Sequence, residues 1–241
     1  MHADTFEDAL VFATDAIREI SGFARVKIYR FLADWSGEVI AESSDGKLQS
    51  YLGLCFPASD IPKQVRAIME IVPYRAIGTP TDDALPILAA DGYEGELDLT
   101  WSVLRSVSSM HTQYLRNIGV GAAFSTSLMH QRRLWGLIAA HNDTPGLLPF
   151  DSWSLLQEIG TAVMLRFDQQ RRTETTNMIS QLRKIENQFS SALRSNGDIE
   201  DVLLDLVPVL RKFLGADGFA FQYGSNLHVS GKAPTLRLFE N

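Results

Sequence analysis

The fold is decided by two neighbouring stretches, FARVKIYRFL at residues 23–32 and GEVIAESS at residues 37–44. The first is rich in β-branched and aromatic residues, with Val26 and Ile28 on one face and Tyr29 and Phe31 on the other. Apolar residues on both faces are typical of a strand that is covered on both sides, so we expect it near the centre of a sheet. The second stretch alternates after a turn at 34–37, which predicts its antiparallel hairpin partner.

The same signature occurs again further along the chain. AAFSTSLM at 122–129 and RLWGLIAA at 133–140 predict a second antiparallel strand pair around a polar turn. Residues 5–21 place apolar side chains three and four positions apart, which predicts an amphipathic helix that ends near Gly22. Two strand pairs with flanking helices predict an α+β fold with a central antiparallel sheet.

The other segments predict helices, one long loop and a further hairpin. Residues 45–121 contain helix patterns and a loop marked by proline and glycine from Gly78 to Gly95, and loops of this length are usually functional. Residues 151–194 contain no proline and predict one long helix or two nearly continuous ones. A short heptad seam lies within that segment, and another helix (201–215) and a hairpin (218–231) come after the segment. The seam residues are Met178, Leu182, Ile185, Phe189 and Ala192.

The composition restricts the class of protein. The 241 residues carry a formal charge of −7, from 22 basic and 29 acidic residues, and 45% of them are hydrophobic. Such a chain is expected to have a packed core, and its acidic balance argues against a general nucleic-acid binder, which needs a concentrated positive surface. No apolar run approaches the ~18 residues that span a bilayer, and the N-terminus is acidic where a signal peptide is basic, so we expect a cytoplasmic protein with no membrane partner. The single cysteine, Cys55, excludes an internal disulfide.

Common catalytic and metal-binding signatures are missing from the sequence. It contains no HExxH, GxGxxG, GxSxG or Walker-type phosphate loop, which argues against the common hydrolases and nucleotide-binding enzymes. His111 and His141 have no cysteine or carboxylate at ligand spacing, so we expect no metal site. These absences predict a protein that is not an enzyme.

Polar residues in two predicted helical segments have either a structural role or a role in binding a ligand. In PASDIPKQVR (57–66), Ser59 or Asp60 would cap a helix that has Pro62 at its first position, or Asp60 would serve a ligand. In the helix around 105–120, His111 shares a face with Tyr114 and is either a core histidine or a ligand contact.

The second strand pair places polar residues on an otherwise apolar sheet. His141 ends a strand and is expected on the same face as Trp135, Leu137 and Ala139, while Ser125 and Ser127 share one face of the partner strand. Buried polar groups need hydrogen-bond partners. A polar ligand would supply them at this corner of the sheet.

Together these motifs resemble those of one family. The runs YLGLCFPASDIPKQVRAI (51–68) and LDLTWSVLRSVSSMHTQYLRNIGVGAAFSTSLMHQRRLWGLIAAHNDTP (97–145) resemble the bilin-binding GAF domain of phytochromes, most of all bacterial phytochromes. The resemblance runs from about residue 5 to 170, and the segment that follows is similar to the connecting helix and the start of a PHY domain. It implies a GAF domain at 1–168, a connecting helix at 169–195 and a truncated PHY domain at 196–241, with no N-terminal PAS domain.

The resemblance implies a role for each matching residue around a linear tetrapyrrole, biliverdin or another bilin. Asp60 would place its backbone carbonyl against the pyrrole N–H groups, His111 would lie over the pyrrole nitrogens, and His141 would hydrogen-bond the D-ring carbonyl. The other expected contacts flank the Asp60 motif (Ile61 and Pro62), wall the space of the D ring (Tyr29, Phe56 and Tyr114) or bind the propionates (Arg75, Arg105 and Ser125).

Covalent attachment of the pigment would need a cysteine. Bacterial members use a cysteine ahead of a PAS domain, a segment that is not present here, and plant and cyanobacterial members use one immediately before the motif histidine, where this chain has Met110. Cys55 is therefore the candidate for attachment, and the alternative is a buried apolar thiol.

The resemblance implies a red/far-red photoreceptor module. Light would isomerise the double bond between the C and D rings, and the long helix of a homodimer would carry the signal. The alternative is a phytochrome-like GAF scaffold that has lost bilin attachment and serves as a dimerisation or signalling module. A parent protein could carry a histidine kinase output that is absent here.

Overall fold

The computed structural model describes residues 5–81, 86–95, 97–103, 105–195 and 197–232. The chain divides into two compact units, Met1–Gln170 and Arg171–Asn241. The outer ends of the expected first and last segments, residues 1–4 and 233–241, lie outside the described residues.

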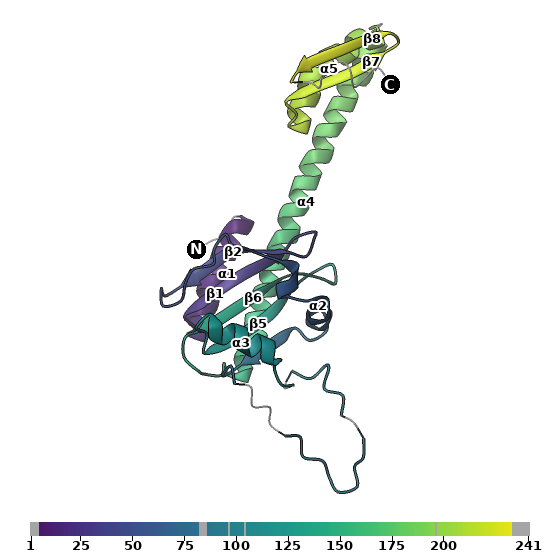
Figure 1. Ribbon diagram of the computed structural model, residues 1–241. Helices are drawn as coiled ribbons and strands as arrows, with labels where there is room; N and C mark the ends of the chain where they lie inside the picture. Colours follow the sequence, from purple (N-terminus) through teal and green to yellow (C-terminus); the bar gives the residue numbers. More distant parts are fainter. Residues whose placement is uncertain (1–4, 82–85, 96, 104, 196, 233–241) are drawn as a thin grey trace. The chain divides into compact units, whose positions relative to one another are not determined.

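The first unit is built on a six-stranded sheet in which every neighbouring pair is antiparallel (Figure 1). The strand order is β3-β2-β1-β6-β5-β4, so the strand expected to be central, β1, lies between its hairpin partner and the second strand pair. Both predicted strand pairs are confirmed, whereas β3 and β4 were not foreseen. The strands are β1 (Arg25–Phe31), β2 (Gly37–Ser44), β3 (Cys55–Phe56), β4 (Tyr74–Ile77), β5 (Ala122–His130) and β6 (Arg133–Asn142).

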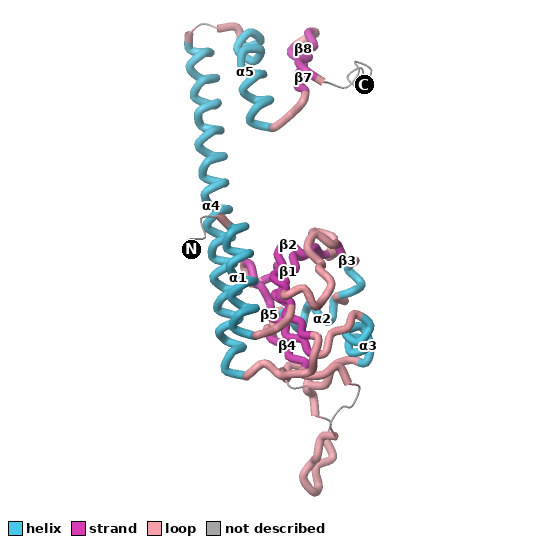
Figure 2. The backbone as a smooth tube through the Cα atoms, turned by 90° about the vertical axis from the view of Figure 1, so that its left-hand side faces the viewer, coloured by secondary structure: helices cyan, strands magenta, loops and turns pink. Residues whose placement is uncertain are grey.

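One face of the sheet packs against α1 (Phe6–Ser21) and the first part of α4 (Phe150–Arg194), as Figure 2 shows. The predicted N-terminal helix is confirmed. Thr5 and Asp8 form a capping box at its start, and Gly22 ends it in the left-handed conformation that a residue without a Cβ adopts most easily. Burial of apolar surface holds this layer together. The core includes Leu10 and Ile17 from α1, Val26, Ile28 and Ile138 from the sheet, and Trp153 and Leu156 from α4.

The opposite face is covered by shorter segments, α2 (Lys63–Met69) and α3 (Ser109–Asn117) (Figure 2). The capping interpretation of Ser59 and Asp60 is wrong. These residues lie in a 3-10 turn, Ala58–Asp60, and α2 begins only at Lys63. Pro62 is the N-cap residue of α2 instead of its first helical residue, and no side chain caps that helix. The side chains of Ser59 and Asp60 therefore do not cap a helix.

The prediction that Trp135 shares a face with Leu137 and His141 is also wrong. The register of β5 and β6 shifts between Leu128 and Met129, which leaves Trp135 as an extra residue on β6. Such a bulge interrupts the alternation of faces. Trp135 therefore packs on the α1 and α4 side, against Phe6 and Phe167, while Leu137 lies on the other face with Tyr29.

The predicted long helix is a single helix of 45 residues, α4, which continues from the first unit into the second. The second unit also contains α5 (Ile199–Leu214) and a hairpin of β7 (Gly218–Tyr223) and β8 (Asn226–Gly231), as predicted. Asp198 caps α5, and Glu200 on the same helix accepts a hydrogen bond from Asn226 of β8 at 2.9 Å. None of the described helices is long and apolar enough to cross a membrane.

Candidate functional site

A row of residues crosses the face of the sheet that α2 and α3 cover, and we call it the site face. Cross-strand pairing aligns Arg75 with Ser125, Ser125 with Ala139, Ala139 with Lys27, and Lys27 with Glu42. Residues opposite each other on neighbouring strands project to the same side of a sheet. With strands about 4.8 Å apart, the three strand spacings put Arg75 and Lys27 about 14 Å from each other. The face thus has a cationic group near each end of an elongated strip.

Arg25, Lys27 and His141 form one end of this strip. Arg25 pairs with His141 across β1 and β6, and its Nη2 lies 2.8 Å from Nδ1 of that histidine. The Arg25 guanidinium and the Lys27 ammonium lie over the ring of Tyr51, at 4.2 and 4.4 Å from its centroid. Burial, and then the charge of Arg25, lowers the pKa of Lys27 to about 7, against the weaker opposing effect of Glu42. Burial, with Lys27 and Arg25, also lowers the pKa of His141 well below its ordinary value.

Arg75, Arg105 and His111 form the other end. The Nη1 atom of Arg75 is buried and has no hydrogen-bond partner, and no described carboxylate lies within ion-pair distance of either arginine. Burial, and then the charge of Arg105, lowers the pKa of Arg75 to about 10. His111 is open to solvent on its outer side, but the protein around it and the charge of Arg75 lower its pKa. Two neighbouring guanidinium groups without a carboxylate suit an anionic ligand group, such as a carboxylate.

Aromatic side chains line the strip near Asp60. The ring of Tyr29 lies 5.2 Å from that of Phe31 and 6.1 Å from that of Phe56, between centroids. Burial, and then the charges of Asp60 and Tyr114, raises the pKa of Tyr29 to about 12, so both groups are its neighbours. Tyr114 in turn stacks on His111 at 6.1 Å. A flat apolar ligand would find aromatic rings and hydroxyl groups here.

Arg66 holds the loop that carries Asp60. Its Nη1 donates to the carbonyl oxygens of Ile61 at 2.6 Å and Ala58 at 3.3 Å, and its guanidinium lies 4.7 Å from the ring centroid of Trp35. The backbone on both sides of Asp60 is thereby tied to the turn between β1 and β2. The side chain of Asp60 is exposed and can contact a ligand.

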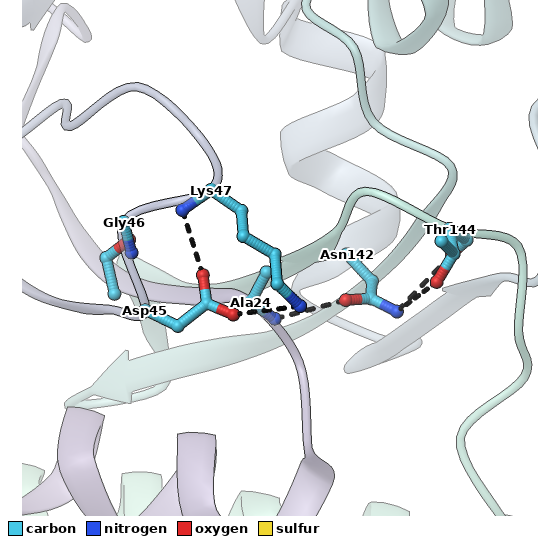
Figure 3. A network of polar contacts seen from close by, with 7 residues as sticks. Ala24, Asp45, Gly46, Lys47, Asn142 and Thr144 are labelled. Carbon is cyan, nitrogen blue, oxygen red and sulfur yellow. Dashed lines mark hydrogen bonds and ion pairs between the residues drawn. The ribbon is translucent and has the colours of Figure 1, made fainter.

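A polar network fixes the sheet beside His141 (Figure 3). The side chain of Asn142 accepts from the backbone N–H of Ala24 at 3.2 Å and donates to the hydroxyl of Thr144 at 3.0 Å. Asp45 donates its backbone N–H to the carbonyl of Ala24 at 2.9 Å and pairs with Lys47 at 3.2 Å. These contacts join the start of β1 to the end of β6, so the positions of Arg25 and His141 are fixed relative to each other.

The side chains of the site suit an organic ligand. No group of three possible metal ligands occurs among the described residues. Cations and a histidine stand at each end, and aromatic rings and tyrosine hydroxyls line the wall near Asp60. This donor set fits an elongated molecule with carboxylates and carbonyl groups.

Comparison with known proteins gives the family. The GAF domain model matches residues 6–167. The chain is 34% identical to cyanobacterial phytochrome B of Nostoc over 236 residues, covering 97% of this chain and 31% of the relative. It is 38% identical to the bacteriophytochrome of Pseudomonas aeruginosa over 188 residues, covering 76% of this chain and 26% of the relative. The chain belongs to the GAF domain family, among the phytochromes.

Solved phytochrome structures have the same fold. The photosensory core module of Stigmatella aurantiaca phytochrome matches with a TM-score of 0.85 at 32% identity, covering 98% of this chain and 47% of that one. A bacteriophytochrome from R. palustris matches with a TM-score of 0.83 at 33% identity, covering 99% and 48%. The chain therefore spans about half of these structures and between a quarter and a third of the curated relatives named above.

This phytochrome GAF domain brings the residues singled out from the sequence to one face, apart from Cys55, which pairs with Glu38 at the edge of the sheet and alternates with Phe56. Ser125 pairs with Arg75, and Ile61, with Pro62 next to it, packs against the cluster of Tyr29. Eight others take part in the contacts or charge interactions described above: Tyr29, Phe56, Asp60, Arg75, Arg105, His111, Tyr114 and His141.

Two alternatives weighed for single residues are wrong. His111 is not a core histidine, because Thr112 and Leu115 form the buried side of α3 and His111 is exposed. Cys55 is not a buried apolar thiol, because it lies exposed on β3 at the edge of the sheet.

The sequence reasoning missed four residues of the site: Arg25, Lys27, Tyr51 and Arg66. For two of them a signal was present. Arg25 and Lys27 alternate with Val26 and Ile28 and lie in phase with Tyr29, so they had to project to the face opposite the main core. Tyr51 and Arg66 lie outside that strand and carry no comparable signal.

Proposed function

We propose that this chain is a chromophore-binding photosensory module that holds a linear tetrapyrrole, biliverdin, on the site face and responds to red and far-red light. The unpartnered guanidinium of Arg75 beside Arg105 carries the proposal, because a bilin has two propionate carboxylates to place there. Membership of the phytochrome family supports it, and so do matching structures described as chromophore-binding domains. As a sensor in the cytoplasm, the module would not itself be an enzyme.

Each site residue has a role in this proposal. Arg75, Arg105 and Ser125 bind the propionates, and the backbone carbonyl of Asp60 and the ring of His111 hold the pyrrole nitrogens. His141 hydrogen-bonds the D-ring carbonyl, and the bound bilin supplies light absorption and isomerisation of its C/D-ring double bond. Around that ring the wall is formed by Tyr29, Phe56, Tyr114, Ile61 and Pro62.

Biliverdin assembly tests the proposal. Purified protein is mixed with biliverdin, and the absorption spectrum is recorded before and after red and far-red illumination. We expect a red absorption band that changes reversibly. Arg75→Gln should weaken biliverdin binding about 10- to 100-fold, since a hydrogen bond to a charged group contributes about 1.5–3 kcal/mol. Arg133→Gln, at the exposed first residue of β6, is the matched control and should bind as the wild type. A wild-type protein with no red band would contradict the proposal and favour a scaffold without pigment.

We propose Cys55 as the site of covalent attachment. The thiol is exposed, and Cys55 contributes to the electrostatic surroundings of Tyr29 at the wall of the site. Denaturing electrophoresis with zinc-induced fluorescence detects bilin that stays on the chain. We expect a fluorescent band for the wild type and none for Cys55→Ser, while both proteins keep the red absorption. A band that persists in Cys55→Ser would exclude this cysteine.

The segments after the GAF domain have a signalling role in the proposal. Residues 1–168 form the bilin-binding domain, residues 169–195 are the connecting helix, and residues 196–241 begin a PHY domain. The apolar seam along α4 would join two copies of the chain as a homodimer, in which the long helix has two arrangements that light biases.

A further inference from the structure

The contact between Arg25 and His141 decides where the imidazole proton of His141 lies. Nη2 of Arg25 is 2.8 Å from Nδ1 of His141, and the two side chains are buried, with 1% and 7% of their surface exposed. A guanidinium group has only N–H donors and remains charged in proteins, so it cannot accept a hydrogen bond. Nδ1 must therefore accept and carry the lone pair.

The ring of His141 is neutral. Burial and the positive charges of Lys27 and Arg25 keep its pKa well below the ordinary value, and His111 adds a smaller effect in the same direction. A neutral imidazole carries one proton. Since Nδ1 accepts from Arg25, that proton is on Nε2.

The arrangement is held in place from several sides. Arg25 also donates from Nη1 to the carbonyl oxygen of Gln49 and lies over the ring of Tyr51. Its backbone pairs with that of His141 across β1 and β6, and the side chain of Asn142 joins the two strands next to this pair (Figure 3). A guanidinium with its position fixed in this way presents its N–H group to Nδ1 without rearrangement.

Nε2 is the free end of the ring. Among the described residues, Arg25 is the only hydrogen-bond partner of the His141 side chain. Nε2 keeps some exposure to solvent in the bilin-free chain. A ligand group that covers it has to be an acceptor such as a carbonyl oxygen, because an N–H donor that loses its water without gaining an acceptor is destabilising.

We propose that Arg25 is a positioning residue that fixes His141 in the Nε2–H tautomer, so that the histidine is a preformed hydrogen-bond donor for a carbonyl oxygen of the ligand. The ligand half of this inference rests on the proposed bilin function, but the tautomer half concerns the bilin-free chain alone.

The tautomer is measured by NMR of bilin-free protein labelled with ¹⁵N at histidine. The chain has five histidines, so the signals of His141 are assigned by their loss in His141→Gln. Two-bond ¹H–¹⁵N correlations distinguish a protonated from an unprotonated ring nitrogen. We expect a single Nε2–H pattern at pH 7 in the wild type. A protonated Nδ1 or a doubly protonated ring would overturn the inference without any variant.

Three variants test the role of Arg25. Arg25→Met removes the donor, and we expect a mixture of both tautomers. Arg25→Lys keeps an N–H donor that cannot accept while its ammonium is protonated, and it should restore the single Nε2–H pattern at a pH where that ammonium holds its proton. Arg30→Met is the matched control on the same strand, where Arg30 pairs with Glu38 at 2.8 Å, and it should leave His141 unchanged. An unchanged single tautomer in a folded Arg25→Met would show that another group positions the proton.

The biliverdin-loaded proteins separate this inference from the proposed function. We expect a shifted red band in Arg25→Met and a wild-type band in Arg25→Lys. If the wild type shows the Nε2–H tautomer but no red band, the proposed function fails and the role of Arg25 stands. If a red band forms and His141 carries its proton on Nδ1, the function stands and the role of Arg25 fails.

Discussion

Replacing Lys27 by methionine should stabilise the first unit in a manner that depends on pH. Only 7% of the Lys27 surface is exposed, and its pKa is lowered from 10.5 to about 7, so the folded chain holds this proton less tightly than the unfolded chain. The unfolded state therefore binds more protons between pH 7 and 10.5, and stability rises with pH across that window. At 1.36 kcal/mol per pKa unit, the weaker hold of the folded chain on the Lys27 proton destabilises the fold by about 4 kcal/mol at pH 7 and by about 2 kcal/mol at pH 9.

The change between the two pH values is the sharper observable. Lys27→Met also differs from lysine in its packing against the Tyr51 ring, and this difference is the same at pH 7 and 9. We therefore expect the stability advantage of Lys27→Met to shrink by about 2 kcal/mol from pH 7 to pH 9.

Urea unfolding of the bilin-free protein, followed by tryptophan fluorescence, measures this difference. All four tryptophans of the chain lie in residues 1–170, so their fluorescence reports on the unit that contains Lys27. Lys47→Met is the control, because the Lys47 side chain is 61% exposed and loses little hydration on folding. A stability difference that is equal at pH 7 and pH 9 would refute the reasoning that burial lowers the pKa of Lys27 to about 7.

Three further predictions concern packing and assembly. Gly136→Ala should destabilise the first unit by more than about 2 kcal/mol in urea unfolding, because a Cβ there would lie 2.3 Å from the backbone oxygen of Tyr29; equal stability would mean that β1 and β6 separate easily. Leu156→Ala, at a fully buried position of α4, should cost about 2–5 kcal/mol in the same assay, and Leu165→Ala, 65% exposed, less than about 1 kcal/mol. Leu182→Glu in the exposed seam should convert the proposed dimer to a monomer by light scattering, and a wild-type monomer would contradict the dimer.

Local sequence patterns were sufficient for most of the fold. The alternation in GEVIAESS, the three-and-four spacing of α1 and the absence of proline from α4 each correspond to an element that the structure contains. These patterns are strong because one side of each element is buried and its period is repeated several times. β3 and β4 have only two and four residues, too few for a period to be recognised, and their existence depends on pairing with strands far away in the sequence.

The site was less accessible from the sequence because its residues meet only through the sheet. The motif residues Asp60 and His111 were found through a family resemblance, whereas no motif marks Arg25 and Lys27. Their alternation with Val26 and Ile28 fixes which face they occupy, but not what they meet there. That Arg25 donates to His141 follows from the register of β1 and β6, which two short strands separated by more than 100 residues do not reveal. The bulge at Trp135 illustrates the same limit, since one extra residue reversed the face expected from alternation.

The buried cations connect the stability of this domain with its ligand. Arg25, Lys27 and Arg75 project to one face of the sheet, and Glu42 is the only carboxylate that acts on any of them in the described interactions. Burying a charge without a counter-charge is destabilising, so the bilin-free fold carries this cost in the region where a bilin would place its propionates and carbonyl groups. A ligand that binds only the folded state stabilises it by mass action, and here it would also relieve the repulsion between Arg75 and Arg105. The features that weaken the fold are therefore the ones that should make it bind an anionic, carbonyl-bearing pigment.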